Sequence, residues 1–211
     1  MKQILLVDDH LVVITGLTTV INNFLAHCKI DSASNGSAAF EKIKHKNYDL
    51  IIMDVSLPHT DSFNVVKDIL ALKPGSKILM FSMASTEIFA KKYLRMGAIG
   101  YVSKDASLTE IKTAIDDALK NKGYISETLK AKLGMNGVMD DNCESEFDKL
   151  SPREFEIVRH LAHGQSISEI SGKLKLHTST VGTHKARIFE KLHCHNIIEL
   201  ATMAKVHNII L

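Results

Sequence analysis

The sequence predicts a parallel α/β domain followed by a small all-helical domain. Short, near-continuous apolar runs recur through the first half of the chain and alternate with stretches whose apolar residues repeat at helical spacing. Strands that are apolar on both faces are typical of a parallel sheet covered by helices on both sides. From about residue 150 onward every strong pattern is helical. These three observations fix the predicted class of both domains.

The apolar runs and helical stretches give five βα units over residues 1–122. The strands are predicted at residues 4–7, 29–33, 50–53, 78–81 and 101–102. The helices are predicted at 14–24, 37–44, 63–70 and 88–94, with a fifth that begins at Ser107. There Ser107 and Glu110 have the spacing of a capping box. The first domain is therefore predicted to be a doubly wound sheet of five parallel strands.

A polar linker is predicted at 123–147, where periodicity fades and glycines and acidic residues gather around one short helix near 127–132. The second domain is predicted at 148–211. Its first helix begins after the N-cap Ser151 and ends at Gly164. Two more helices are predicted over Ile167–Leu174 and Thr178–Leu192. Two helices joined by a tight turn suit docking in the major groove of DNA.

Charge and cysteine content narrow the possible classes. Residues 1–149 hold 18 Lys and Arg against 19 Asp and Glu, whereas residues 150–211 hold 8 against 5. This asymmetry permits a nucleic-acid partner for the second domain. The cysteines Cys28, Cys143 and Cys194 are far apart and odd in number, which argues against a disulfide framework or a structural zinc site. No secretory leader or membrane span is expected.

Polar residues follow the carboxyl ends of four predicted strands. They are Asp8, Asp9, Asp54, Ser82 and Lys104. In a doubly wound sheet ligands bind at this edge, so these side chains are expected to converge on one pocket. Three crowded carboxylates need a compensating hard cation, which predicts an Mg²⁺ site. Each residue alone can have a purely structural role, such as capping the next helix, but their joint placement favours a binding site.

The chemistry of this pocket follows from the carboxylate on the third strand. Asp54 is placed to act as a nucleophile toward a phosphoryl group, once a metal and a cation neutralise the approaching oxygens. Lys104 is the candidate cation. Ser82 can donate a hydrogen bond to the phosphoryl group that Asp54 acquires.

The stretches Leu6–His10, Met53–Pro58 and Gly100–Lys104, together with Ser82, closely resemble the receiver domain of bacterial response regulators. The resemblance covers residues 1–122 and implies a flavodoxin-like fold. It also implies phosphorylation by a sensor histidine kinase.

The resemblance assigns roles to the pocket residues. It implies that Asp54 is the phosphoacceptor and that Asp8 and Asp9 are the acidic pair that holds Mg²⁺ with it. The Ser56 backbone carbonyl is implied as a further protein contact to the metal.

The resemblance also implies a switch. Ser82 would be the switch hydroxyl, Lys104 the pocket lysine, and Tyr101 the aromatic residue that turns inward on activation. Plain packing of Tyr101 against the sheet is an equal alternative. One departure stands out, because Ser62 occupies a position where the family usually has glycine.

The third helix of the second domain carries polar residues mainly off its apolar stripe. They are Thr180, Thr183, His184, Lys185 and Arg187. Hydroxyl and positive groups of this kind suit phosphates and base edges. A solvated polar face is the alternative interpretation. Histidines at helical spacing nearby lack an accompanying thiolate cluster, so zinc is not predicted.

Leu150–Glu154, Gly164–Ser166, Glu169–Ile170, Thr180–Val181, His184 and Lys191–Leu192 resemble the LuxR-type helix-turn-helix over 148–211. The whole chain thus resembles a NarL/FixJ-type response regulator, which implies a cytoplasmic protein that binds promoter DNA as a homodimer when phosphorylated. Two departures weaken the expected DNA affinity. The family usually has lysine at Gly182 and asparagine-lysine at Ile167 and Ser168.

We therefore expect a transcription regulator in which Mg²⁺-dependent phosphorylation of Asp54 controls dimerisation and DNA binding. It would catalyse only its own phosphoryl uptake and loss. A small-molecule phosphatase or phosphotransferase is a second interpretation, for which the sequence offers no cap domain or substrate pocket. A phosphoryl sink or protein adaptor with weakened DNA binding is the third.

Overall fold

The computed structural model describes residues 1–57, 60–83, 87–132, 146–174, 176–207 and 209–210. It divides the chain into two compact units, Met1–Asp140 and Asp141–Leu211. Most of the second half of the predicted linker, with Cys143, lies outside the described residues.

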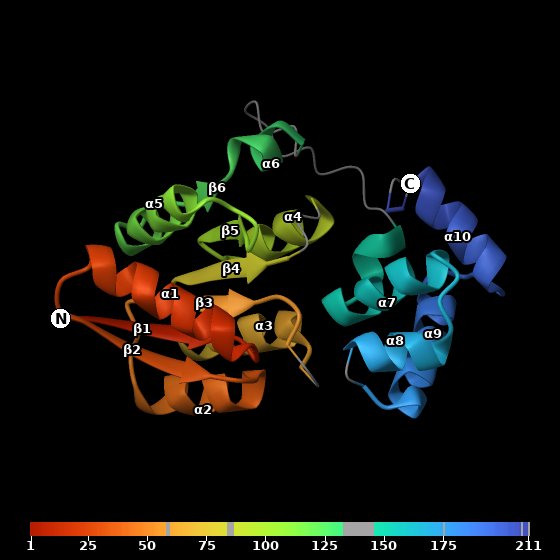
Figure 1. Ribbon diagram of the computed structural model, residues 1–211, viewed down its shortest axis with the longest axis horizontal. Coiled ribbons are helices and arrows are strands. Elements are labelled where there is room, and N and C mark those ends of the chain that lie inside the picture. Colours follow the sequence, from red (N-terminus) through yellow and green to blue (C-terminus); the bar gives the residue numbers. More distant parts are fainter. Residues whose placement is uncertain (58–59, 84–86, 133–145, 175, 208, 211) are drawn as a thin grey trace. The chain divides into compact units, whose positions relative to one another are not determined.

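The first unit is built on a six-stranded parallel sheet in the order β2-β1-β3-β4-β5-β6 (Figure 1). The strands are β1 (Lys2–Val7), β2 (Cys28–Ala33), β3 (Leu50–Asp54), β4 (Ile78–Ser82), β5 (Gly100–Ser103) and β6 (Tyr124–Ile125). Every neighbouring pair is parallel. The predicted class is confirmed, and its five predicted strands are present.

The sixth strand was missed. β6 has two residues, too few to show a period, and it pairs Tyr124 with Gly100 of β5. A Cβ atom at Gly100 would lie 2.6 Å from the Tyr124 backbone oxygen, so glycine is required for this close approach. The sheet therefore extends into the segment predicted as linker.

Helices cover both faces of the sheet (Figure 1). α1 (Leu11–Phe24) and α5 (Leu108–Leu119) lie on one face, and α2 (Gly36–His45), α3 (Ser62–Leu72) and α4 (Glu87–Met96) lie on the other. Leu17 and Ile21 of α1 and Ile111 and Ile115 of α5 join Ile4 and other strand residues in one buried cluster. Burying each such side chain contributes about 1.5–3 kcal/mol to the stability of this layer. The short α6 (Glu127–Lys132) follows β6.

The N-terminus of α5 differs from the predicted capping box. The Ser107 hydroxyl accepts a hydrogen bond from the Glu110 backbone N–H at 3.2 Å, as predicted for an N-cap. The Glu110 carboxylate instead accepts a hydrogen bond from the Tyr124 hydroxyl at 3.0 Å. The sequence could not show this contact, because it depends on the position of β6.

The second unit consists of a 3₁₀ turn, Glu146–Lys149, and the helices α7 (Pro152–Ala162), α8 (Ile167–Leu174), α9 (Thr178–Lys191) and α10 (Ile197–Val206). The three predicted helices are present, and α10 adds a fourth that had not been delimited. Gly164, with φ of +76°, allows the chain to turn after α7. The core includes Phe155, Val181 and Leu200, all nearly inaccessible to solvent.

A buried carboxylate ties two of these helices together. Glu154 accepts a hydrogen bond from the Ser151 backbone N–H at 2.8 Å, which completes a capping box at the start of α7. The same carboxylate lies 2.6 Å from the Lys191 Nζ atom at the end of α9. In neither unit is a described helix long and apolar enough to cross a bilayer.

Candidate functional site

The parallel strands deliver the predicted pocket residues to one edge of the sheet. Asp8 directly follows β1, Asp54 is the last residue of β3, Ser82 is the last residue of β4, and Lys104 directly follows β5. All four lie at the carboxyl ends of the central strands β1, β3, β4 and β5, which are neighbours in the sheet. The carboxyl edge therefore presents two acids, a hydroxyl and an ammonium group side by side.

Lys104 links two of the carboxylates. Its Nζ atom lies 2.6 Å from an Asp8 oxygen and 2.9 Å from an Asp54 oxygen. The three side chains are 7% or less exposed. A buried carboxylate is costly unless it is paired, so the ammonium group compensates for placing two acids at this edge.

The pKa values of the pair reflect burial and charge together. Burial raises the pKa of Asp54, and the positive charge of Lys104 only partly offsets this effect. For Lys104, burial acts to lower the pKa, but the charges and hydrogen bonds of Asp54 and Asp8 outweigh it and the net shift is upward. The lysine therefore stays protonated at neutral pH.

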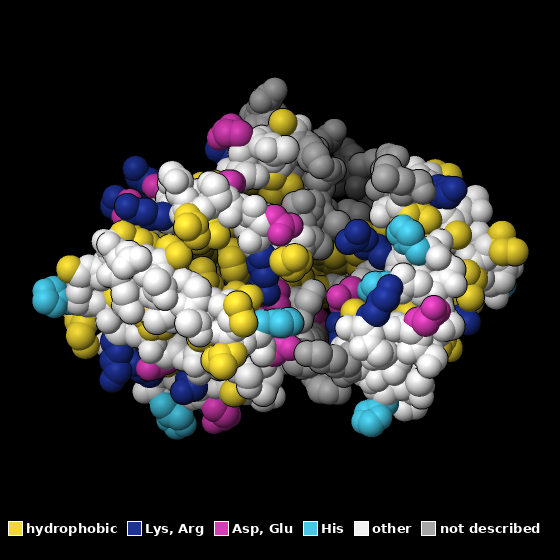
Figure 2. Space-filling view, viewed as in Figure 1, with side chains coloured by type: hydrophobic (Ala, Val, Ile, Leu, Met, Phe, Trp, Pro, Cys, Tyr) yellow, Lys and Arg dark blue, Asp and Glu magenta, His cyan; other side chains and the backbone are white. Residues whose placement is uncertain are grey.

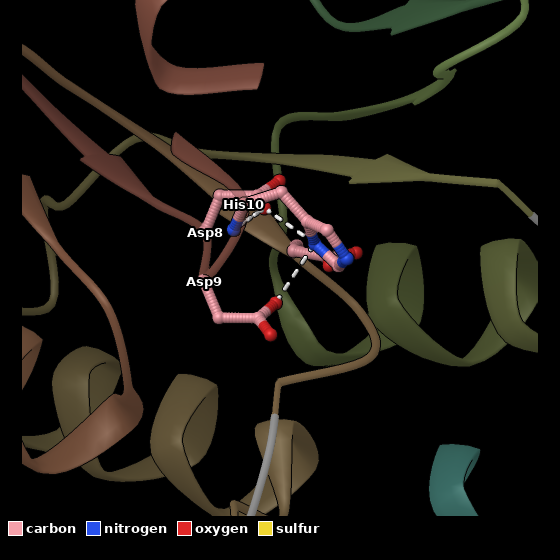
Figure 3. Close-up of side chains that lie close together, drawn as sticks. Asp8, Asp9 and His10 are labelled. Atoms are coloured by element: carbon pink, nitrogen blue, oxygen red, sulfur yellow. Dashed lines mark hydrogen bonds and ion pairs between the residues drawn. The ribbon is translucent and has the colours of Figure 1, made fainter. Parts of the chain in front are cut away.

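Asp9 and His10 complete a cluster of metal-ligating groups with these acids (Figure 3). Single ligand atoms from Asp8, Asp9, His10 and Asp54 all lie within 4.8 Å of one another. The His10 Nδ1 atom lies 3.0 Å from Asp9 and 3.2 Å from Asp8. His10 was not among the predicted metal residues. Its position directly after the two acids is the signal that could have included it.

This donor set fits a hard divalent cation. Three carboxylates face one lysine, so the cluster keeps a net negative charge, and carboxylate oxygens are the ligands that Mg²⁺ prefers. Asp9 is the open side of the cluster, because it is exposed whereas Asp8 and Asp54 are buried.

Backbone and hydroxyl groups surround Asp54. The Ser56 backbone N–H donates a hydrogen bond to Asp54 Oδ1 at 3.2 Å. Ser82 is 1% exposed at the end of the adjacent strand. Tyr101 is also 1% exposed, and burial raises the pKa of its hydroxyl while the neighbouring Ser82 side chain acts to lower it. The two predicted switch residues thus lie close enough to interact, which the sequence alone could not show.

The predicted DNA-contacting residues all lie on α9, but they differ in exposure. Thr183 and Arg187 are exposed, whereas Thr180, His184 and Lys185 are half-buried. The Lys185 Nζ atom lies 5.3 Å from the centre of the Phe189 ring, so its stem follows the helix surface. Burial lowers the pKa of His184, and its Nδ1 atom has no hydrogen-bond partner. The helix therefore offers two open contacts and three partly covered ones.

Gly182 and Ile167, two residues that depart from the family pattern, lie on α9 and at the start of α8. A Cβ atom at Gly182 would meet nothing within 4 Å, so no packing requires glycine on α9. Ile167 begins α8 and is half-buried. Ser166 before it accepts a hydrogen bond from the Glu169 N–H, and Glu169 accepts one from the Ser166 N–H at 2.7 Å. A capping box thus starts α8.

Comparison with known proteins supports both domains. Residues 4–116 match the family described as response regulator receiver domain, and residues 148–204 match bacterial regulatory proteins of the luxR family. Response regulator GacA of Pseudomonas aeruginosa is 30% identical over 210 residues, which cover 100% of this chain and 98% of that protein. Response regulator UvrY of Escherichia coli is 29% identical, with coverage of 99% and 96%.

Solved structures with the same fold include the RcsB response regulator of Salmonella typhimurium, with a TM-score of 0.60 at 21% identity and coverage of 97% and 100%. A structure of two RcsB dimers bound to two parallel DNAs has a TM-score of 0.59 at 22% identity, with coverage of 97% and 98%. The chain belongs to the response regulators of the NarL/FixJ type, in which phosphorylation of a receiver domain regulates transcription through a LuxR-type DNA-binding domain.

Proposed function

We propose that Asp54 takes up the phosphoryl group, with a sensor histidine kinase as the donor. The observation that carries this proposal is the contact of the buried Asp54 carboxylate with Lys104 at 2.9 Å, beside the acidic pair Asp8 and Asp9. A nucleophilic carboxylate needs positive charge around it before it can approach an anionic phosphoryl group. Asp54 has such a partner at the open edge of the sheet.

Asp8, Asp9, Asp54 and the Ser56 backbone carbonyl would hold Mg²⁺. The metal would supply charge that neutralises the oxygens of the transferring group. An Asp54 oxygen forms the new bond to phosphorus while the bond from phosphorus to the donor's histidine nitrogen breaks. Lys104 balances the charge of the phosphoryl oxygens, and the Ser56 N–H holds the second Asp54 oxygen in place.

The acyl phosphate then forms on the protein itself and is later hydrolysed. The chain is therefore proposed to catalyse only its own phosphoryl uptake and loss. Because its proposed partners are a kinase domain and promoter DNA, we propose that the protein acts in the cytoplasm.

Ser82 and Tyr101 would report the state of Asp54. The two side chains are buried and close enough to interact. A phosphoryl group on Asp54 offers the Ser82 hydroxyl a charged acceptor on the neighbouring strand. This new hydrogen bond would shift the population of receiver conformations. A coupling of about 1–3 kcal/mol is enough for a useful switch.

The second domain would bind promoter DNA through α9 as a homodimer. Arg187 and Thr183 are exposed on this helix, and Lys185 can extend toward phosphate. Figure 2 shows Lys, Arg and His side chains on the surface of the second unit. Lys185 and Arg187 are the two Lys or Arg residues among the proposed contacts on α9, so one copy would make few phosphate contacts through this helix, and two half-sites would add theirs together. RcsB, which shares the fold, binds DNA as dimers.

A phosphoryl sink or adaptor is the second candidate. Gly182 on α9 lacks a side chain, and three of the five proposed contacts are half-buried. DNA affinity weak enough to be physiologically silent would follow from this surface. Salt-sensitive binding to a promoter fragment separates the two candidates, because a sink needs none.

Intact-mass measurement after incubation with Mg²⁺ and acetyl phosphate tests the proposed acceptor. We expect one added phosphoryl group on the wild-type chain and none on Asp54→Asn. Asp61→Asn is the matched control, since Asp61 is exposed and caps α3. Equal modification of wild type and Asp54→Asn would assign the chemistry to another residue.

A further inference from the structure

A buried hydroxyl group holds the segment that follows Asp54. The Ser62 Oγ atom donates a hydrogen bond to the Val55 backbone oxygen at 2.5 Å. Ser62 is 1% exposed and Val55 is 3% exposed, so water does not compete for this bond. Ser62 is the first residue of α3, and it reaches back across the loop to the residue next to Asp54.

The same hydroxyl contacts helix α4. The Tyr93 hydroxyl lies 2.8 Å from Ser62 Oγ, and Tyr93 is fully buried. The Tyr93 ring stacks on Phe63, with ring centres 4.4 Å apart, and this stacking limits where its hydroxyl can point. The Ser62–Tyr93 contact thus connects the start of α3 to α4.

The hydrogen bonds have one direction. A serine hydroxyl carries a single proton, and Ser62 gives it to the Val55 oxygen. The Tyr93 hydroxyl must therefore be the donor to Ser62. Burial raises the pKa of Tyr93 well above its ordinary value, so it keeps the proton that it donates.

The final step passes through one peptide group. The Val55 carbonyl and the Ser56 N–H belong to the same planar unit and turn together. The Ser56 N–H donates to Asp54 Oδ1 at 3.2 Å. A chain of donors therefore runs from Tyr93 to Ser62, through this peptide, to the Asp54 carboxylate. Hydrogen bonds in such a chain polarise one another, and this one ends on a carboxylate.

We propose that Ser62 and Tyr93 are positioning residues for phosphoryl uptake, which hold the Val55–Ser56 peptide in the orientation that presents its N–H to Asp54 and link it to helix α4. The usual glycine at position 62 has no hydroxyl and could not form this relay. Ser62 is thus more than a tolerated departure from the family pattern. The inference rests on Asp54 being the phosphoacceptor.

The test measures the rate of phosphoryl uptake by full-length protein from acetyl phosphate at saturating Mg²⁺. Tyr93→Phe removes only the terminal hydroxyl, and Ser62→Ala removes only the central one. Each is expected to slow uptake about twofold to tenfold, the size of one lost hydrogen bond. Because both act through one chain, the double variant should be no slower than the slower single variant.

Tyr48→Phe is the matched control. The Tyr48 hydroxyl also makes a 2.8 Å hydrogen bond to a side chain, Asp31, but away from the relay. Its loss should leave the rate unchanged. The amide resonance of Ser56 should shift in Tyr93→Phe and stay in place in Tyr48→Phe, a result that loss of packing alone would not give.

Three results would overturn the inference. They are an unchanged rate in Tyr93→Phe, equal slowing in Tyr48→Phe, and rate effects of Ser62→Ala and Tyr93→Phe that multiply in the double variant. Should Ser62→Ala fail to fold, Tyr93→Phe and Ser62→Gly still decide the matter. If the wild type takes up no phosphoryl group, the proposed function itself fails, which is a distinct outcome.

Discussion

The Lys104 ammonium group lies 2.9 Å from the Asp54 carboxylate, although the two residues are 50 positions apart in the sequence. Two parallel strands, β3 and β5, end at the same edge on either side of β4, and this topology creates the contact. Lys104 also contacts Asp8, so one cation balances the charge of two buried carboxylates.

Replacement of Lys104 by methionine should therefore destabilise the receiver and abolish most phosphoryl uptake. Two buried carboxylates would lose their partner, and we expect the free energy of unfolding to fall by about 2–4 kcal/mol. Added Mg²⁺ should recover more stability in this variant than in the wild type. Urea unfolding with and without Mg²⁺ measures both effects.

Lys77→Met is the control for that experiment. The Lys77 Nζ atom donates to the Leu119 backbone oxygen at 2.8 Å and has no carboxylate role at the pocket. A loss of stability in Lys77→Met as large as in Lys104→Met, with no difference in Mg²⁺ response, would contradict the assigned charge balance.

Asp54→Asn should stabilise the protein at neutral pH in the absence of Mg²⁺. Burial raises the pKa of Asp54 in the folded state, so the folded form binds this proton more tightly than the unfolded chain does. The stability contributed by Asp54 is present below its unfolded pKa and is lost as pH rises through the folded pKa. The variant avoids this loss, so the two proteins should differ at pH 7 and converge toward pH 3. Unfolding curves that stay parallel across this range would contradict the burial effect.

Adding a side chain at Gly182 should strengthen both helix α9 and its contact with DNA. Because a Cβ atom at Gly182 meets nothing within 4 Å, Gly182→Ala should raise helical-domain stability by about 0.5–1 kcal/mol. Gly182→Lys should add a phosphate contact and steepen the slope of log affinity against log salt by about 0.9. Gly172→Lys on α8, also unobstructed, is the control and should leave that slope alone. Thermal unfolding and promoter binding at several salt concentrations provide the measurements.

Two capping boxes in the second domain should differ in strength. Glu154 is 3% exposed and also pairs with Lys191, whereas Glu169 is exposed. Glu154→Gln should lower the free energy of unfolding by about 1–3 kcal/mol, because the Lys191 ammonium group would lose its charged partner. Glu169→Gln should cost less. Equal losses in chemical denaturation would show that burial of Glu154 adds nothing.

The sequence predicted most of the pocket because the pocket depends on topology. Once the strands were recognised as parallel, Asp54, Ser82 and Lys104 had to meet at one edge, and the structure brings them together there. The roles proposed for them follow from chemistry that the residue types already imply.

What the sequence could not predict depends on contacts between distant side chains. The relay between Ser62 and Tyr93 joins residues 31 positions apart, and no periodicity links them. β6 was missed because two residues show no pattern, and with it the Glu110–Tyr124 bond. Likewise, helical spacing placed His184 on α9 but could not show that its Nδ1 atom is buried.

The affinity of the full chain for a promoter fragment, measured at one fixed salt concentration before and after phosphorylation, tests the central claim most directly. We predict that phosphorylation tightens binding about 5-fold to 150-fold and that Asp54→Asn, treated in the same way, shows no change. Identical affinities for the phosphorylated and unmodified wild-type protein would contradict the account and favour a phosphoryl sink or adaptor.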